Sequence, residues 1–336
     1  MSAESNSLSR SYGYKTVLKW LKQSKKKPFA FQTEAWQYYA EGYSGMVNAP
    51  TGFGKTFSMF LAVVIEELNI INELKATTTK TSKKRSDTGL KLLWITPLRS
   101  LAKDLARAMR EVCDELELDW IIGVRNGDTS QTDKLKQKKQ MPEVLIITPE
   151  SMHLLLAQKG TISNFANLRC IVADEWHELI GSKRGVLAEL AISRIRGLLL
   201  EKHPERLLRI WGISATIGNM EEALDVLVPY EEVLKVTVKA DIEKKIDIRS
   251  VLPDHIDMLP WAGHLGHKLA HKLLPIIHKS KTTLIFTNTR GQAELWYQNL
   301  LKLDENLAGL IAIHHGSIDH ELRNWIEDAI HTGALK

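Results

Sequence analysis

Short runs of apolar residues alternate along this chain with longer segments whose apolar residues recur every three or four positions. Each short run ends in a small, polar or proline residue, which is typical of a buried strand that leads into a loop. The longer segments have the spacing of amphipathic helices, as in Phe57, Phe60, Leu61, Val64, Ile65 and Leu68. The predicted strands are residues 46–49, 92–96, 144–148, 168–173, 210–214, 283–287 and 310–313.

This alternation predicts an α/β fold, with a mostly parallel sheet covered by helices on both faces. Ligands of such sheets bind at the carboxyl ends of the strands. The pattern changes near residues 230–245, where residues 239–245 are highly charged, and this marks a domain boundary. We therefore predict an N-terminal extension at residues 1–27, a first domain at 28–240 and a second domain at 241–336. Residues 1–13 are Ser-rich, and we expect them to fray.

Composition adds little to this picture. The 336 residues fit two domains, and a net charge of +5 is a mild basic excess that suits a polyanionic partner without proving one. Cys113 and Cys170 lie in apolar periodic runs, so we expect both to be buried. The polar N-terminus and the lack of a long apolar run predict a cytoplasmic protein without a membrane association. We interpret residues 76–88 as a mobile surface insertion and residues 133–140 as a solvated basic face.

Residues 49–56 (APTGFGKT) lie between a predicted strand and an amphipathic helix, the context that a phosphate-binding loop requires. Glycines let backbone N–H groups turn toward phosphates, and the helix N-terminus adds a positive dipole. The Lys55 ammonium can reach the β- and γ-phosphates, and the Thr56 hydroxyl can bind Mg²⁺. The first position holds Ala49 instead of glycine, a substitution typical of helicases. The segment predicts ATP and Mg²⁺ as cofactors, held by Thr51, Gly52, Gly54, Lys55 and Thr56.

Residues 174–177 (DEWH) follow the predicted strand 168–173. A carboxylate at a strand end can lie beside the nucleotide's Mg²⁺, and the adjacent Glu175 can orient and deprotonate the attacking water. Acidic pairs at strand ends are common surface features, so the tetrad indicates a catalytic site only because a phosphate-binding loop precedes it in the same chain. We assign Lys55, Asp174, Glu175 and His177 to catalysis, and Thr56 and Asp174 to Mg²⁺.

Residues 214–216 (SAT) follow another predicted strand. The hydroxyls of Ser214 and Thr216 can bond to the acidic site and relay its state, which predicts a coupling role. Taken alone, the segment is much more typical of an ordinary turn from a strand into a loop.

Together these motifs resemble the superfamily-two helicases of the DEXH-box type. By this resemblance Gln32, in residues 29–32 (FAFQ), reads the adenine of ATP. Nucleic-acid contacts are implied for residues 96–101 (TPLRSL), 127–129 (GDT), 148–150 (TPE), 286–290 (FTNTR) and 315–317 (HGS). The Thr-Pro pairs have a structural alternative, since proline also ends strands. The assigned contact residues are Thr96, Pro97, Arg99, Gly127, Asp128, Thr148, Pro149, Thr287, Asn288, Arg290, Gly316 and Ser317.

Residues 177–185 (HELIGSKRG) make the chain most similar to the large helicase-related (Lhr) group, which includes bacterial ligase-associated DEXH-box helicases. The resemblance implies a RecA-like ATP-binding domain of the P-loop NTPase class, followed by a second RecA-like domain. It also implies ATP-driven movement on single-stranded or partly duplex DNA, 3′-to-5′ unwinding and a part in DNA repair, with a DNA ligase and a nuclease as candidate partners. An RNA helicase and a nucleic-acid-binding module without useful turnover are the alternatives.

The resemblance further implies two motifs late in the second RecA-like domain, one of them rich in arginine. Neither is present after Ile313, so we expect this domain to be incomplete and the chain to be a fragment or a truncated gene product. An arginine finger is worth roughly 10³ to 10⁵ in rate. We therefore expect the chain to bind ATP–Mg²⁺ with little strand-stimulated hydrolysis and no unwinding.

Overall fold

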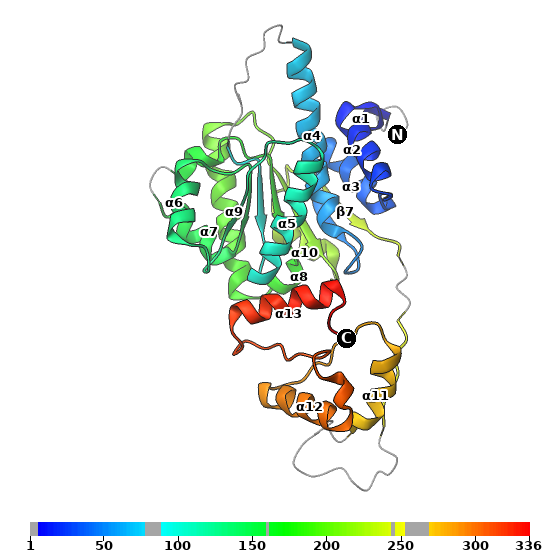
Figure 1. The fold of residues 1–336 in the computed structure, drawn as a ribbon. Helices are drawn as coiled ribbons and strands as arrows, with labels where there is room; N and C mark the ends of the chain where they lie inside the picture. Colours follow the sequence, from blue (N-terminus) through cyan, green and yellow to red (C-terminus); the bar gives the residue numbers. More distant parts are fainter. Residues whose placement is uncertain (1–5, 78–88, 159–160, 243–245, 253–268) are drawn as a thin grey trace. The chain divides into compact units, whose positions relative to one another are not determined.

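The computed structural model describes residues 6–77, 89–158, 161–242, 246–252 and 269–336 (Figure 1). The chain divides into two compact units, Met1–Lys244 and Lys245–Lys336. Most of the predicted insertion at residues 76–88 lies outside the described residues. Among the described helices, none combines the length and the apolar character that crossing a membrane requires.

A seven-stranded sheet forms the centre of the first unit, in the order β3-β4-β2-β5-β6-β1-β7 with every pairing parallel. This confirms the predicted parallel α/β fold. Five of the predicted strands correspond to β1, β2, β4, β5 and β6. The strands are β1 (Ser44–Asn48), β2 (Leu92–Ile95), β3 (Ile122–Arg125), β4 (Val144–Ile147), β5 (Cys170–Ala173), β6 (Arg209–Ser214) and β7 (Lys235–Lys239).

The two strands that the sequence analysis missed, β3 and β7, lie at the two edges of the sheet. The central strands β2, β4 and β5 are buried throughout, whereas the edge strands have mixed burial. Strands buried on both faces appear as continuous apolar runs, and edge strands do not. Part of the segment 230–245, which we interpreted as a domain boundary, belongs to β7.

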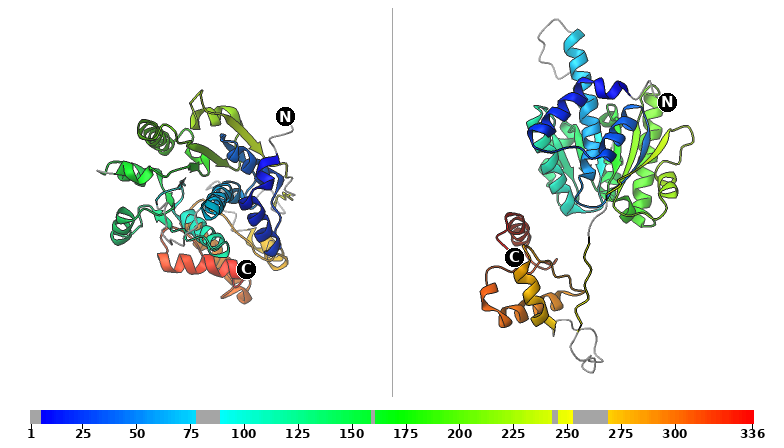
Figure 2. Two further views of the ribbon diagram at one scale, coloured as in Figure 1. Left: turned by 90° about the horizontal axis from the view of Figure 1, so that it is seen from above. Right: turned by 90° about the vertical axis from the view of Figure 1, so that its right-hand side faces the viewer.

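Helices cover both faces of this sheet (Figure 2). Successive strand residues point to opposite faces, so Leu92 and Trp94 join one core cluster while Leu93 and Ile95 join the other. The first cluster includes α2 (Tyr12–Gln23), α3 (Ala30–Ala40), α4 (Lys55–Thr77) and α5 (Arg99–Glu115). The second includes α7 (Pro149–Leu156), α8 (Trp176–Leu179), α9 (Lys183–Lys202) and α10 (Met220–Leu227).

Three local expectations can be compared with the first unit. Residues 6–13 do not fray, because they form α1 (Asn6–Arg10) and the start of α2, and Leu8 is buried in the first core cluster. Both cysteines are buried as predicted. The basic segment lies on α6 (Gln131–Lys139), which buries none of its residues and so forms the predicted solvated face. The assignment of functional domains to residues 28–240 and 241–336 stays a prediction.

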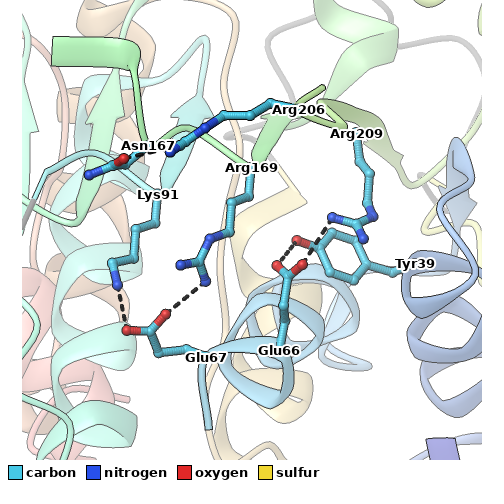
Figure 3. Close-up of polar contacts among 8 residues, drawn as sticks. All are labelled: Tyr39, Glu66, Glu67, Lys91, Asn167, Arg169, Arg206 and Arg209. Atoms are coloured by element: carbon cyan, nitrogen blue, oxygen red, sulfur yellow. Dashed lines mark hydrogen bonds and ion pairs between the residues drawn. The ribbon is translucent and has the colours of Figure 1, made fainter. Parts of the chain in front are cut away.

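A cluster of buried charges lies at the amino ends of the central strands, where it holds the middle of α4 (Figure 3). The Glu66 carboxylate accepts hydrogen bonds from Arg209 Nη1 at 3.1 Å and from the Tyr39 hydroxyl at 2.8 Å. The Arg209 guanidinium also lies 4.3 Å from the centre of the Tyr39 ring. Burial, with the Glu66 carboxylate adding to it, keeps the pKa of Tyr39 well above its usual value.

The adjacent Glu67 carboxylate forms the second half of this cluster (Figure 3). It accepts a hydrogen bond from Arg169 Nη1 at 2.7 Å and another from the Lys91 ammonium. Lys91 and Arg169 stand directly before β2 and β5, as Arg209 stands at the start of β6. Buried charges are tolerated when they are paired. The cluster therefore fixes α4 against β2, β5 and β6.

The second unit is helical among its described residues. Its helices are α11 (Ala270–Lys279), α12 (Arg290–Leu303) and α13 (His320–Thr332), and a short 3₁₀ turn covers Glu305–Leu307. The strands predicted at residues 283–287 and 310–313 are not formed.

These two segments lack a continuous ladder partner among the described residues. Thr283 N–H donates to the Lys336 carbonyl at 2.6 Å, and Lys336 N–H donates to the Leu310 carbonyl at 2.8 Å. The backbone of Lys336 thus bonds to both segments without extending either bond into a ladder. A cavity of about 550 Å³ is lined by Leu284, Phe286 and other residues of both segments. Phe286 is 90% exposed, so the apolar side chains predicted for a buried strand remain open to solvent.

Candidate nucleotide site and nucleic-acid interface

The phosphate-binding loop connects β1 to α4, which begins at Lys55. Gly52 has a φ of +90° and Gly54 a φ of +72°, a left-handed backbone that favours glycine. A Cβ atom on Gly52 would meet nothing within 4 Å among the described residues, so the loop leaves open space beside its backbone. Thr51 is exposed and Thr56 is half-buried in the first turn of α4. The loop therefore has the backbone form that the sequence predicts.

Gln32, the predicted adenine reader, is buried and touches the loop directly. Its Nε2 donates to the Gly54 carbonyl at 2.9 Å, and its Oε1 accepts from Phe29 N–H at 2.9 Å. These bonds use one of the two N–H donors of the amide. Gln32 thus ties the start of α3 to the phosphate-binding loop.

Asp174 lies at the carboxyl end of β5 and is buried. Trp94 Nε1 donates to its Oδ2 at 3.1 Å, and Glu175 N–H donates to its Oδ1 at 3.0 Å. Burial raises the pKa of Asp174 to about 6, while the Trp94 hydrogen bond opposes the rise. The sequence analysis gave Trp94 no role, because a tryptophan inside an apolar run predicts only core packing.

Lys55 and Glu175 approach each other at the end of the sheet where β1 and β5 finish. Lys55 Nζ lies 3.5 Å from Glu175 Oε1. Glu175 has φ 44° and ψ 49°, a left-handed backbone that costs a non-glycine residue roughly 1–2 kcal/mol. Within the described part of the chain, Lys55 Nζ and Glu175 Oε2 are buried and make no hydrogen bond. Such atoms are costly unless a ligand binds them, so the site fits the phosphates and cation of ATP–Mg²⁺.

His177 lies in α8, beside Glu175. Its Nδ1 is 3.4 Å from Glu175 Oε2 and shares a hydrogen bond of 3.0 Å with Ser214 Oγ at the end of β6. Thr216, the other predicted coupling residue, is exposed. Ser214 is thus placed to sense the acidic site, and Thr216 has no such contact among the hydrogen bonds of the described residues.

The three nucleic-acid motifs predicted in the first unit follow β2, β3 and β4, which are neighbours in the sheet. Thr96 and Pro97, and likewise Thr148 and Pro149, are buried. Gly127 is exposed beside Arg99, whose Nη1 donates to Asp128 Oδ1 at 2.9 Å. Parallel strands bring their carboxyl ends to one edge, so the structure gathers these motifs there.

The motifs predicted in the second unit gather within that unit, at the N-terminus of α12. Arg290, the first residue of the helix, donates to Ser317 Oγ and lies close to Gly316. The Thr287 hydroxyl donates to the Thr289 carbonyl at 3.1 Å, and Asn288 N–H donates to Gln292 Oε1 at 3.3 Å. All five predicted residues of this group are half-buried or exposed.

The parallel sheet, the phosphate-binding loop before α4 and the acidic pair after β5 define the fold class of P-loop nucleoside triphosphatases. The family model for the DEAD/DEAH box helicase matches residues 29–223. The chain therefore belongs to the DEAD/DEAH box helicase family.

Curated relatives carry the name of the Lhr group, which confirms the predicted resemblance. The chain is 30% identical to the ATP-dependent helicase Lhr-Core of Saccharolobus solfataricus, over 95% of the chain and 36% of that protein. It is 32% identical to the Lhr-Core helicase of Sulfolobus acidocaldarius, again over 95% of the chain and 36% of that protein. The chain thus spans about a third of the length of these relatives.

A solved structure of the helicase Lhr of Mycobacterium smegmatis bound to ssDNA and AMP-PNP has the same fold. The TM-score is 0.75 at 24% identity, and the match covers 94% of this chain and 40% of that one. This likeness confirms a RecA-like architecture.

Proposed function

We propose that this chain is the ATP-binding motor of a DNA helicase, which couples ATP hydrolysis to movement on single-stranded DNA. The observation that carries the proposal is the pair of buried, unbonded groups of Lys55 and Glu175 beside Asp174. They lie at the edge of the sheet where β2, β3 and β4 also end in the predicted nucleic-acid motifs. A nucleotide site and a polyanion site that both lie at the carboxyl ends of the strands are close enough for ligand binding at one to affect the other.

Each residue of the proposed nucleotide site has a separate task. The Lys55 ammonium binds the phosphates, and Thr56 and Asp174 hold Mg²⁺, which when bound neutralises charge on the phosphoryl group. Glu175 orients the attacking water and takes its proton. His177 lies between Glu175 and Ser214, and its hydrogen bond to Ser214 transmits a change at Glu175 to the end of β6.

The proposed substrate strand is DNA, gripped through its backbone. Arginine and backbone N–H groups at loop ends bind phosphates without reading bases, which a translocating motor requires. Among the similar solved structures, the Lhr helicase is bound to ssDNA and the helicase MrfA is bound to DNA. We further propose a role in DNA repair in the cytoplasm, with a DNA ligase and a nuclease as partners. RNA is the competing strand, since phosphate contacts separate the two poorly.

The proposal is tested by two binding measurements on the chain. A fluorescent ATP analogue with Mg²⁺ should bind the chain and should bind Lys55→Ala more weakly. A labelled single-stranded DNA should bind in a salt-dependent and sequence-tolerant manner, and unlabelled RNA should compete more weakly than DNA. If Lys55→Ala binds the analogue as tightly as the unchanged chain does, the proposed nucleotide site is wrong. If RNA competes more strongly than DNA, an RNA helicase is favoured.

A further inference from the structure

Arg184, the second residue of α9, joins two of the proposed nucleic-acid motifs. Its guanidinium donates to both carboxylate oxygens of Glu150, through Nε and through Nη2 at 3.2 Å. Its Nη1 donates to the Pro97 carbonyl at 2.7 Å. The rigid fork of a guanidinium can span a carboxylate and a carbonyl in this way, whereas a lysine ammonium cannot reproduce the geometry.

Pro97 and Glu150 follow β2 and β4, which pair in parallel. Pro97 belongs to the loop before α5, and Glu150 is the second residue of α7. The Pro97 loop leads to the exposed Arg99 at the start of α5, and Glu150 lies at the N-terminus of α7, and both are groups that suit phosphate binding. Arg184 therefore fixes the relative position of two surfaces that, under the proposed function, must contact one strand together.

The start of α9 is also packed closely on α8, which follows Glu175. A Cβ atom on Gly185 would lie 2.1 Å from the Leu179 carbonyl, so only glycine permits this approach. The Ser182 hydroxyl donates to the same carbonyl at 2.7 Å and caps α9 by accepting from Gly185 N–H at 3.1 Å. The connection from Glu175 to Arg184 is thus short and well bonded, and a shift of α8 would move Arg184.

Arg184 also changes the charge that a nucleic-acid strand meets. Glu150 is exposed, and a bare carboxylate there would repel phosphates. The Arg184 guanidinium holds the pKa of Glu150 below its usual value, so the pair stays ionised and mutually neutralised.

We propose that Arg184 is a positioning residue: it holds the Pro97 and Glu150 loops in one arrangement and neutralises Glu150, so that both loops bind the same strand. This inference rests on the proposed function. It assigns Arg184 to the protein's own loops and not to a phosphate, because three of its N–H groups already donate to Glu150 and Pro97.

The test measures the affinity of the chain for a labelled oligo(dT), by fluorescence anisotropy at several salt concentrations. Arg184→Ala should weaken binding about tenfold, within the range of a coupling energy spread through packed loops. When Glu150→Gln is added to Arg184→Ala, the local net charge is unchanged, and the slope of log affinity against log salt should stay that of the unchanged chain because no phosphate contact is lost. Arg184→Lys should recover only part of the affinity, since it keeps the charge and loses the fork.

Arg196→Ala is the matched control. It removes a guanidinium from the same helix, and with it an ion pair to Glu232, away from these loops. It should leave the affinity within about twofold. A second variant, Arg184→Ala with Glu150→Gln, removes the uncompensated carboxylate and should bind more tightly than Arg184→Ala alone. Urea unfolding of each variant shows whether the first unit is intact.

Three results overturn the inference. If Arg184→Ala binds like Arg196→Ala, the residue does not position the loops. If the salt slope of Arg184→Ala with Glu150→Gln is smaller than that of the unchanged chain by about 0.7, the guanidinium itself contacts a phosphate. If Glu150→Gln adds nothing to Arg184→Ala, the neutralising role is wrong. If the unchanged chain does not bind DNA, the proposed function itself is contradicted. The three results above arise only when the unchanged chain does bind DNA, so the two kinds of failure can be distinguished.

Discussion

Two clusters of buried charge lie at opposite ends of the central sheet, and they are built differently. At the amino ends, Glu66 and Glu67 each accept hydrogen bonds from two side chains (Figure 3). At the carboxyl ends, Lys55 and Glu175 stand 3.5 Å apart with buried atoms that make no hydrogen bond in the described structure. The carboxylates of the first cluster have side-chain donors within the protein, whereas Lys55 and Glu175 share an ion pair and have unused hydrogen-bonding atoms.

Helix α4 belongs to both clusters, since it begins at Lys55 and carries Glu66 and Glu67 about three turns later. The amino-end cluster therefore helps to fix the helix that carries Lys55 to the carboxyl-end cluster. Strain is confined to the second, where Glu175 has a left-handed backbone. Strain of this kind persists where the surrounding structure holds it and where function uses it. Variants in the cluster at the amino ends should therefore lower stability, and variants in the cluster at the carboxyl ends should lower activity.

The largest effect is expected for Glu67→Ala, which removes the buried carboxylate that pairs with Lys91 and Arg169. Breaking a buried ion pair costs about 3–5 kcal/mol, so the free energy of unfolding of the first unit should fall by this amount. Urea denaturation followed by circular dichroism measures it. Glu111→Ala, at an exposed residue of α5, should change the free energy by about 0.5 kcal/mol or less. Similar losses for both variants would contradict the structural role of the cluster.

Lys55→Ala should have the opposite profile. Removal of one preorganised charged donor lowers the rate of hydrolysis by roughly 10² to 10³-fold, and ATP binding should weaken as well. The free energy of unfolding should fall by less than in Glu67→Ala, because Lys55 makes no hydrogen bond and loses only its 3.5 Å ion pair with Glu175. Binding of a fluorescent ATP analogue and urea denaturation are measured on the same sample. Lys75→Ala removes an exposed charge from the same helix and serves as the control.

Glu175→Gln, in the cluster at the carboxyl ends, should separate the effect on ATP binding from the effect on ATP hydrolysis. Glutamine keeps the shape of the side chain and loses the base, so hydrolysis should fall by roughly 10²-fold while ATP still binds. Single-turnover hydrolysis and analogue binding measure the two effects. A loss of binding as large as that of Lys55→Ala would argue that Glu175 holds the nucleotide instead of activating water.

The smallest effect is expected for Ser214→Ala, which removes the hydrogen bond to His177. One hydrogen bond contributes about 0.5–1.5 kcal/mol, so hydrolysis should fall about two- to tenfold with ATP affinity unchanged. Ser193→Ala is the matched control, because it also removes a single hydroxyl contact, with Tyr230, outside the site. Equal rates for the two variants would show that the Ser214 contact carries no signal.

The central strands, the phosphate-binding loop and the acidic motif could all be predicted from the amino-acid sequence. Each of these depends on neighbours in the chain: a buried strand needs a continuous apolar run, and the loop needs its glycines directly before a helix. The family resemblance rests on the same local motifs, which is why the comparisons confirm it. Edge strands β3 and β7 escaped detection, because a strand exposed on one side has no continuous run.

The pairing of charged residues that are distant in the sequence could be learned only from the tertiary structure. Glu66 and Arg209 are 143 residues apart, and Glu150 and Arg184 are 34 apart, so no local spacing indicates either pair. The same holds for Trp94 and Asp174, which meet because β2 and β5 are adjacent. The segments 283–287 and 310–313 have strand-like sequences, yet they form no strand among the described residues. A strand requires ladder partners, and the identity of the partner is a property of the whole fold.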